Sequence, residues 1–390
     1  MSNHDYLQQT KTLLSQLVAF PVLGGQSNLS IANFIGTYLD QSGIPYHKVD
    51  NEEGTKTAIH CRIGPVVEGG VILSGHMDVV PTEGQAWDTD PFQLTTQGEK
   101  WYGRGTTDMK GFIACCLAML PEMKKANLKK PIYFAFSYDE EIGCRSGALL
   151  AKAIREHYDE RPAFAIIGEP TDMQTVTAEK GMGVFETSVF SRAGHSSQVR
   201  NGASAVQEAA KLALWLENKM EALIAAGHID DRFSPNHSTL QAGIFKGGIA
   251  PNIIADYCHL EWDLRIIPTD DWQAILSDFE QYCREREAIV RAKVPEFKIE
   301  TVPQYPFVPA LDTPAEAGIV DFTNSLNGQN QTGSASFASE AGQFAEAGFE
   351  AVLCGPGSVE QCHIANEYVD IQQIEKCLHF MEKLVATLSE

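Results

Sequence analysis

The chain has 390 residues, and its 51 acidic against 30 basic side chains give a formal net charge of −21. With 44% hydrophobic and 21% charged residues, the composition is that of a folded protein rather than a disordered one. The negative charge predicts no nucleic-acid partner and no binding to an anionic membrane surface. It suits cationic ligands, such as metal ions or amine substrates, although ordinary solubility also explains it.

The sequence also bears on the cellular compartment. No apolar stretch reaches the roughly 20 residues that a membrane helix needs, and the N-terminal segment MSNHDYLQQT lacks the regions of a secretory signal. The nine cysteines are scattered without a CxxC pair, which is more typical of reduced thiols than of a disulfide framework. We therefore expect a cytoplasmic protein.

The first part of the chain alternates predicted helices and strands. Apolar residues at helical spacing predict helices over 5–20, 29–42, 109–125 and 145–157. Short β-rich runs predict strands at 57–62, 71–73, 132–136 and 164–167. This alternation is typical of an α/β domain with a mostly parallel central sheet.

After residue 180 the predicted order becomes strand, helix, strand, strand, helix, strand. The six elements fall at 184–191, 203–225, 239–245, 257–267, 271–290 and 297–302. That order is the one of ferredoxin-like domains. Helix and strand then alternate again at 314–325, 351–353 and 371–388. We therefore predict a catalytic domain of residues 1–180 and 304–390, with residues 181–303 inserted as a dimerisation and lid domain.

Acids and histidines recur where the predicted strands end. They are His76 and Asp78, Glu140 and Glu141, Glu169, and His363, with Asp108 directly before the helix 109–125. Each has an ordinary structural explanation: a capped turn, a solvated loop, a strand end, or a helix N-cap for Asp108. Because parallel strands present their carboxyl ends at one edge of a sheet, we expect these side chains to share a crevice.

Crowded carboxylates need compensating positive charge, and Arg104 is the only cation within these motifs. Two histidines and three carboxylates, one of them shared, suit two divalent ions of the zinc type, and cobalt or manganese could replace zinc. Ligands drawn from five separate loops argue against a structural zinc site, which uses closely spaced Cys and His pairs. We expect Cys362, beside His363, to point away from the ions.

Four segments resemble the motifs of the M20 family of metallo-aminoacylases and peptidases, and the similarity covers nearly the whole chain. They are Ser-Gly-His76-Met-Asp78-Val-Val-Pro, Trp-Tyr-Gly-Arg-Gly-Thr-Thr-Asp108-Met-Lys-Gly, Asp-Glu140-Glu141 and Gly-Glu169-Pro-Thr. Within the family, further segments resemble the acetylornithine deacetylase subgroup. These are Trp87–Phe92, Phe337–Ala341, Gly355–Ser358 and His363–Val369.

The resemblance implies a set of metal ligands. Asp108 would bridge two ions, His76 and Glu169 would complete one site, and Glu141 and His363 would complete the other. The implied cofactors are thus two divalent metal ions, with zinc expected first.

Two further roles near the ions follow from the same resemblance. Asp78 would hydrogen-bond His76 and fix its ring, and Glu140 would be the general base. The peptide bond after Asp108 is often cis in this family.

The remaining implied residues concern the substrate. His195 would reach the active site of a partner subunit in a homodimer and support the oxyanion. Asn252 and Arg265 match positions that hold substrate, and a guanidinium suits the carboxylate of an acylated amino acid. Glu340 could pair with the side-chain ammonium of the substrate, although an acid at a helix N-terminus is its ordinary explanation.

The resemblance therefore implies amide hydrolysis of a small N-acylated amino acid. The specific expectation is deacetylation of N-acetyl-L-ornithine to L-ornithine and acetate, a step of arginine biosynthesis. The alternatives are another M20 amidohydrolase, such as succinyl-diaminopimelate desuccinylase or a broad N-acyl-amino-acid hydrolase, and a metal-free binding protein on the same fold.

Overall fold

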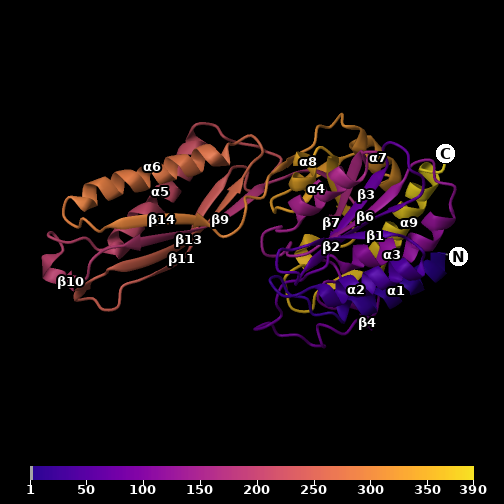
Figure 1. The fold of residues 1–390 in the computed structure, drawn as a ribbon, viewed down its shortest axis with the longest axis horizontal. Coiled ribbons are helices and arrows are strands. Elements are labelled where there is room, and N and C mark those ends of the chain that lie inside the picture. The colour runs from indigo at the N-terminus through magenta and orange to yellow at the C-terminus, as the bar shows by residue number, and fades with distance from the viewer. Residues whose placement is uncertain (1–2) are drawn as a thin grey trace. The chain divides into compact units, whose positions relative to one another are not determined.

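The computed structural model describes residues 3–390, whose chain divides into two compact units (Figure 1). Unit 1 comprises the residues up to Ala178 together with Leu311–Ser334 and Ser339–Glu390. Unit 2 comprises Glu179–Ala310 and Ala335–Ala338. The first two residues of the segment tested above for a secretory signal lie outside the described residues.

A nine-stranded mixed sheet forms the centre of unit 1. Its path runs through β1 (Tyr46–Asp50), β2 (Thr57–Ile63), β6 (Ile132–Ser137), β3 (Val71–His76), β7 (Phe164–Pro170), β17 (Glu350–Gly355), β8 (Thr175–Glu179) and β15 (Leu311–Asp312), and β16 (Thr332–Ala335) pairs with β8. The neighbours β6, β3, β7 and β17 are parallel, whereas β1, β2 and β8 pair antiparallel. The predicted α/β class with a parallel core is thus confirmed.

Continuous apolar runs explain the central strands. Every residue of β3 and of β6 is buried, which is the pattern of strands covered on both faces. The connection from β3 to β6 and the connection from β6 to β7 run in opposite directions along the sheet. Because such crossovers are right-handed, the helices within these two connections cover opposite faces of the sheet.

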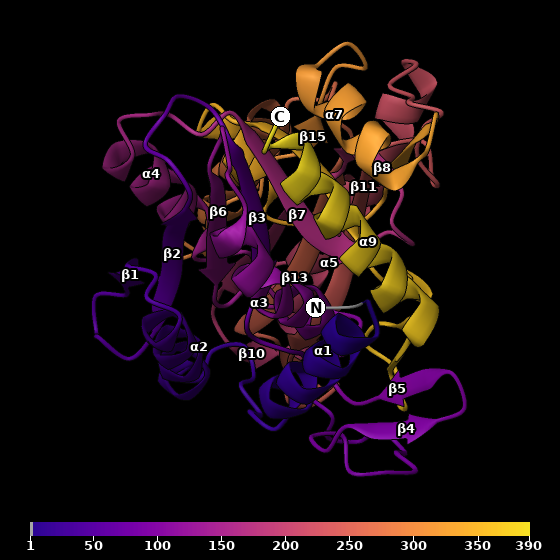
Figure 2. The same cartoon turned by 90° about the vertical axis from the view of Figure 1, so that its right-hand side faces the viewer.

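Apart from the helix at 341–346, which was not predicted, the helices of unit 1 lie close to the predicted positions. They are α1 (Asn3–Val18), α2 (Leu29–Gln41), α3 (Lys110–Lys125), α4 (Gly147–His157), α7 (Gly318–Asn327), α8 (Ala341–Glu346) and α9 (Ile371–Thr387). Helices α1, α3 and α9 pack against one another, and α4 contacts α8. In Figure 2, α1 and α9 are the helices nearest the viewer.

A small three-stranded sheet was not predicted. It joins β4 (Thr95–Gln97), β5 (Lys100–Tyr102) and β18 (Tyr368–Asp370) in the order β18-β5-β4. The pairing of β18 with β5 brings the segment after His363 beside the loop that leads to Asp108.

Unit 2 contains an antiparallel sheet in the order β11-β13-β9-β14. Along the chain its elements are β9 (Gly181–Phe190), α5 (Ala205–Ala225), β11 (Thr239–Gly247), β13 (Tyr257–Ile266), α6 (Trp272–Arg291) and β14 (Lys298–Pro303). Burial alternates along β9 and β13, so one face of the sheet packs on the helices. The predicted ferredoxin-like order is confirmed.

Two further features concern the helices and the cysteines of the described residues. Every helix within residues 3–390 is too short or too polar to cross a membrane. All nine cysteines are buried thiols, and no disulfide joins any of the described residues.

Candidate metal centre

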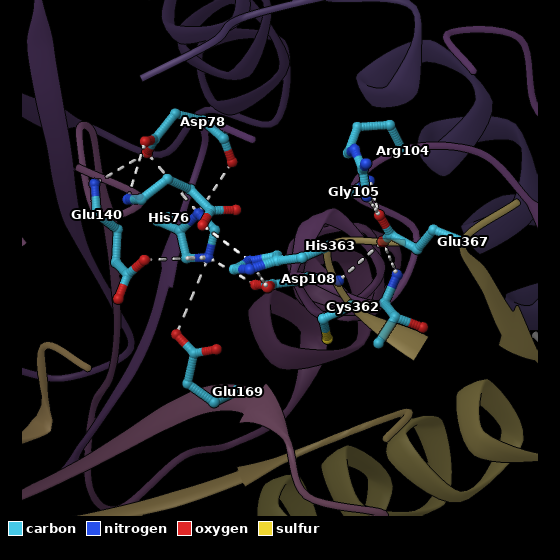
Figure 3. A network of polar contacts seen from close by, with 12 residues as sticks. His76, Asp78, Arg104, Gly105, Asp108, Glu140, Glu169, Cys362, His363 and Glu367 are labelled. Carbon is cyan, nitrogen blue, oxygen red and sulfur yellow. Dashed lines mark hydrogen bonds and ion pairs between the residues drawn. The ribbon is translucent and has the colours of Figure 1, made fainter. Parts of the chain in front are cut away.

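Five side chains meet beyond the carboxyl ends of the parallel strands of unit 1, and four of them are labelled in Figure 3. His76 ends β3, and Glu169 is the penultimate residue of β7. Glu141 follows β6, His363 follows β17, and Asp108 precedes α3. Segments far apart in the sequence thus supply one cluster, as the parallel topology requires.

Asp108 divides the cluster into two triads. Its Oδ1 lies 2.9 Å from Nε2 of His76, and its Oδ2 lies 3.2 Å from Nε2 of His363. His76 Nε2 is also 3.9 Å from Glu169 Oε1, and His363 Nε2 is 3.1 Å from Glu141 Oε2. Within each triad, one ligand atom per residue lies within 4.8 Å of the others.

The donor set fits two divalent cations. Imidazole nitrogens with carboxylate oxygens suit zinc, cobalt and manganese. Oε1 of Glu169 is buried and has no hydrogen-bond partner among the described residues, which is unusual for a buried carboxylate. A cation between Glu169, His76 and Asp108 would satisfy that oxygen.

The N-cap explanation for Asp108 is wrong. Helix α3 begins at Lys110 with Met109 at its N-cap position. The Asp108–Met109 peptide bond is cis, as the family resemblance implies. The Asp108 carboxylate contacts His76 and His363 instead of the free amides of the helix.

Asp78 supports the site differently from the expectation. His76 Nδ1 donates to the main-chain oxygen of Asp78 at 2.9 Å, whereas the Asp78 carboxylate lies 3.7 Å from Nδ1, beyond hydrogen-bond distance. That carboxylate instead accepts the amide N–H groups of Glu140 and Glu141, each at 3.2 Å. The main-chain bond leaves Nε2 of His76 as the nitrogen that faces the triad.

Glu140 lies beside both triads but belongs to neither. Its Oε2 is 4.0 Å from His76 Nε2, and its Oε1 accepts a hydrogen bond from the Cys144 thiol at 3.3 Å. Its neighbour Glu141 turns instead to His363. The two consecutive acids therefore face different histidines.

Charge crowding shifts the pKa values of these groups. Burial raises the pKa of Glu140 to about 8 against the opposing effect of His76, and burial with Asp108 raises that of Glu141 to about 8. Hydrogen bonds to Asp108 and Glu141 raise the pKa of His363 to about 10. Without cations, the cluster holds protons near neutral pH to balance its negative charge, and bound cations would release them.

Glu340 is buried at the N-terminus of α8, with 1% of its surface exposed. The Ser137 hydroxyl donates to its Oε2 at 2.8 Å, and burial raises the pKa of Glu340 to about 7. Oε1 has no hydrogen-bond partner among the described residues. In this conformation, a substrate ammonium reaches that oxygen only if the side chains around it move.

The other residues expected to hold substrate belong to unit 2. His195 in β10 (Gly194–His195) pairs with Ile253 in β12 (Ile253–Ile254), and the amide of Ser196 donates to the Asn252 carbonyl at 3.0 Å. Unit 2 thus brings His195 and Asn252 together.

Arg265 lies on β13. Its Nε donates to the Asp263 carboxylate at 3.1 Å. Its proposed substrate contact would compete with this ion pair.

Sequence reasoning missed the role of Glu367. This carboxylate is fully buried and accepts hydrogen bonds from the Arg104 guanidinium and from the loop that carries Asp108 (Figure 3). It lies within a segment that resembled the deacetylase subgroup, but no spacing rule links it to a partner more than 250 residues away.

Comparison with known proteins shows the family of the chain. A family model described as peptidase family M20/M25/M40 matches residues 72–387. The acetylornithine deacetylase of Erwinia tasmaniensis is 31% identical over 383 residues, which cover 95% of this chain and 95% of that protein.

Solved structures share the fold. An M20 family metallo-carboxypeptidase from Sulfolobus solfataricus superposes with a TM-score of 0.75 at 16% identity, covering 98% of this chain and 99% of that one. The Bacillus subtilis protein YXEP, described as a dinuclear metal-binding peptidase of the M20 family, gives a TM-score of 0.62 at 14% identity, covering 98% of each chain.

Proposed function

The chain belongs to peptidase family M20/M25/M40 and is a metallo-amidohydrolase, and from this premise we propose that it deacetylates N-acetyl-L-ornithine. The observation that carries the two-metal part is Asp108, whose two oxygens face two different histidines. The relative that is named acetylornithine deacetylase, aligned over nearly the full chain, supports the substrate.

We propose that Glu140 moves the proton during hydrolysis. Cations held by the two triads would supply a water of lowered pKa and a Lewis acid for the acyl oxygen. Glu140 Oε2 accepts a proton from the attacking water and returns it to the leaving nitrogen. The Asp78 carboxylate holds the main chain of Glu140 in place during both transfers.

His195 is proposed as the oxyanion donor. The amide of Ser197 donates to its Nδ1 at 3.2 Å, and the Ser197 hydroxyl lies 2.8 Å from the same nitrogen, which leaves Nε2 as the nitrogen that can face a substrate. An exposed imidazole with a protonated Nε2 can donate to an acyl oxygen. Removing one such donor lowers kcat by about 100- to 1,000-fold in known cases, and we expect a loss of that order for His195→Ala.

The family resemblance implies that this donor comes from a partner subunit, and the surface of unit 2 supports the proposal of a homodimer. β11 is an edge strand whose residues 241–247 are all exposed. Ile244 and Phe245 on this strand and Ile249 just beyond it present apolar surface, and an exposed edge of this kind favours pairing with another chain.

The oligomeric state can be tested with two matched variants of unit 2. Phe245→Asp on β11 is expected to convert the dimer to a monomer in sedimentation velocity. Val302→Asp, on the opposite edge strand β14, is the control and should remain dimeric. A monomeric wild type with full activity would contradict both the dimer and the partner role of His195.

The substrate is tested with a panel of acylated amino acids. Purified protein with defined zinc or cobalt is offered N-acetyl-ornithine, succinyl-diaminopimelate and acetyl-methionine, and product release is measured. The proposal expects the highest kcat/KM for N-acetyl-ornithine. Preference for the succinylated substrate, or equal use of all three, would favour a desuccinylase or a broad acylase instead.

A further inference from the structure

Glu367 receives four hydrogen bonds from one loop. Its Oε2 accepts from Arg104 Nη1 at 2.7 Å and from the Gly105 amide at 3.0 Å. Its Oε1 accepts from the amides of Thr107 at 2.9 Å and Asp108 at 3.2 Å. The carboxylate is therefore saturated by donors of residues 104–108.

The main chain adds two bonds in the same place. The Gly103 amide donates to the Glu367 carbonyl at 3.0 Å, and the Thr107 hydroxyl donates to the carbonyl of Tyr368 at 2.6 Å. Gly105 has a φ of 83°, which favours glycine, and a Cβ there would lie 2.7 Å from Val79 Cγ1. The loop is thus shaped to wrap around the carboxylate.

This arrangement joins the pieces of chain that carry two metal ligands. Asp108 is the last residue of the wrapped loop, and His363 lies four residues before Glu367 on the connected segment. Both ligands belong to the triad of Asp108, Glu141 and His363. Hydrogen bonds from amides and a guanidinium to an ionised carboxylate are stronger than those between neutral groups. They therefore hold the loop of residues 104–108 tightly to the segment that carries Glu367.

We propose that Glu367 is a positioning residue that holds Asp108 and His363 in register before any metal binds. The proposal rests on the proposed two-metal centre. Residues that hydrogen-bond to the segments carrying metal ligands, without binding the metal themselves, orient those ligands and tune the metal affinity. The alternative is a buried Glu367–Arg104 ion pair that stabilises the fold alone, and it predicts unchanged metal affinity in any variant that folds.

The test is zinc binding to metal-free protein, measured by competition with a chromophoric chelator. Glu367→Gln places an amide N–H against main-chain donors and should weaken at least the ion of the Asp108–Glu141–His363 triad by about 10- to 100-fold. Glu360→Gln, an exposed neighbour on the same segment, is the control and should bind zinc as the wild type does. Folded Glu367→Gln protein with wild-type affinity for both ions would overturn the proposal.

A second measurement needs no variant. In the metal-free wild type, the amides of Gly105, Thr107 and Asp108 should be protected from hydrogen exchange, because Glu367 already holds them. Exchange of these amides at the rate of an unstructured chain would contradict the proposal even if Glu367→Gln does not fold. Neither experiment uses substrate, so a failure to hydrolyse N-acetyl-ornithine would reject the proposed function without deciding this one.

Discussion

The Asp78 carboxylate accepts the main-chain N–H of Glu140 at 3.2 Å, and it does so while 0% of Asp78 is exposed. Its other oxygen accepts the N–H of Glu141 at the same distance. One buried side chain therefore fixes the turn after β6 from which one acid faces His76 and the next faces His363. This contact therefore directs two consecutive acidic side chains to different parts of the cluster.

Replacing the two acids separately should separate base from ligand. Glu140→Gln is expected to retain two bound ions and lose about 100- to 10,000-fold in kcat, the usual contribution of a general base. Glu141→Gln should instead bind one ion less. Metal content by elemental analysis and steady-state kinetics check both variants.

The control for that comparison is Glu156→Gln on the exposed side of α4, which should match the wild type in both respects. An unchanged kcat in Glu140→Gln would remove Glu140 from the mechanism. Loss of both ions from Glu140→Gln would make it a ligand instead.

Glu340 should discriminate between substrates if its carboxylate pairs with a cationic substrate side chain. Glu340→Gln keeps the size and the Ser137 contact of the side chain but removes its charge. We expect a selective loss of kcat/KM for N-acetyl-ornithine and little change for acetyl-methionine. An equal loss for both substrates would assign Glu340 a packing role, consistent with its burial.

His60 should make the fold sensitive to acid at a place unrelated to the metal centre. It lies with His47 and His157 in a cluster of rings 3.8 to 5.3 Å apart, and Tyr158 hydrogen-bonds its Nδ1 at 3.0 Å. Burial and the two neighbouring histidines lower the pKa of His60 from 6.5 to about 3. As the pH falls below 6.5, His60 therefore becomes protonated in the unfolded chain but stays neutral in the folded protein.

The free energy of unfolding should consequently decline as the pH falls from 6.5 towards 3, because protons bind His60 in the unfolded chain first. Above pH 6.5, His60 is neutral in both states and this loss of stability is absent. Between pH 7.5 and pH 5, the Tm of metal-free His60→Asn should drop less than the Tm of the metal-free wild type. His379→Asn, an exposed histidine on α9, should keep the wild-type slope. Identical slopes in all three proteins would contradict the assigned shift.

The fold was predictable where the sequence carries long periodic or continuous apolar patterns. The strands β3, β6 and β7 and the helices α3, α5 and α9 appear at the expected positions. Strand β1 was missed because its residues, YHKVD, are mostly exposed and polar at a sheet edge. The short strands β4, β5 and β18 were missed because their pairing depends on long-range contacts rather than on local pattern.

The candidate site followed a similar rule. Residues at or shortly beyond strand ends, such as His76 and Glu141, could be placed because topology alone brings strand ends together. The Asp78 contact and the Glu367 bonds could not, because they depend on which carboxylate oxygen meets which amide. Burial of Glu340 was equally hidden, since nothing near it in the sequence shows that α8 packs against α4.

The central claim is tested most directly by adding zinc or cobalt stepwise to metal-free protein while acetate release from N-acetyl-L-ornithine is measured. The account predicts no release without metal and a rise to a plateau by two equivalents, with Asp108→Asn inactive and unable to bind two ions. Full activity without metal, or no release from protein shown to hold two ions, would contradict it.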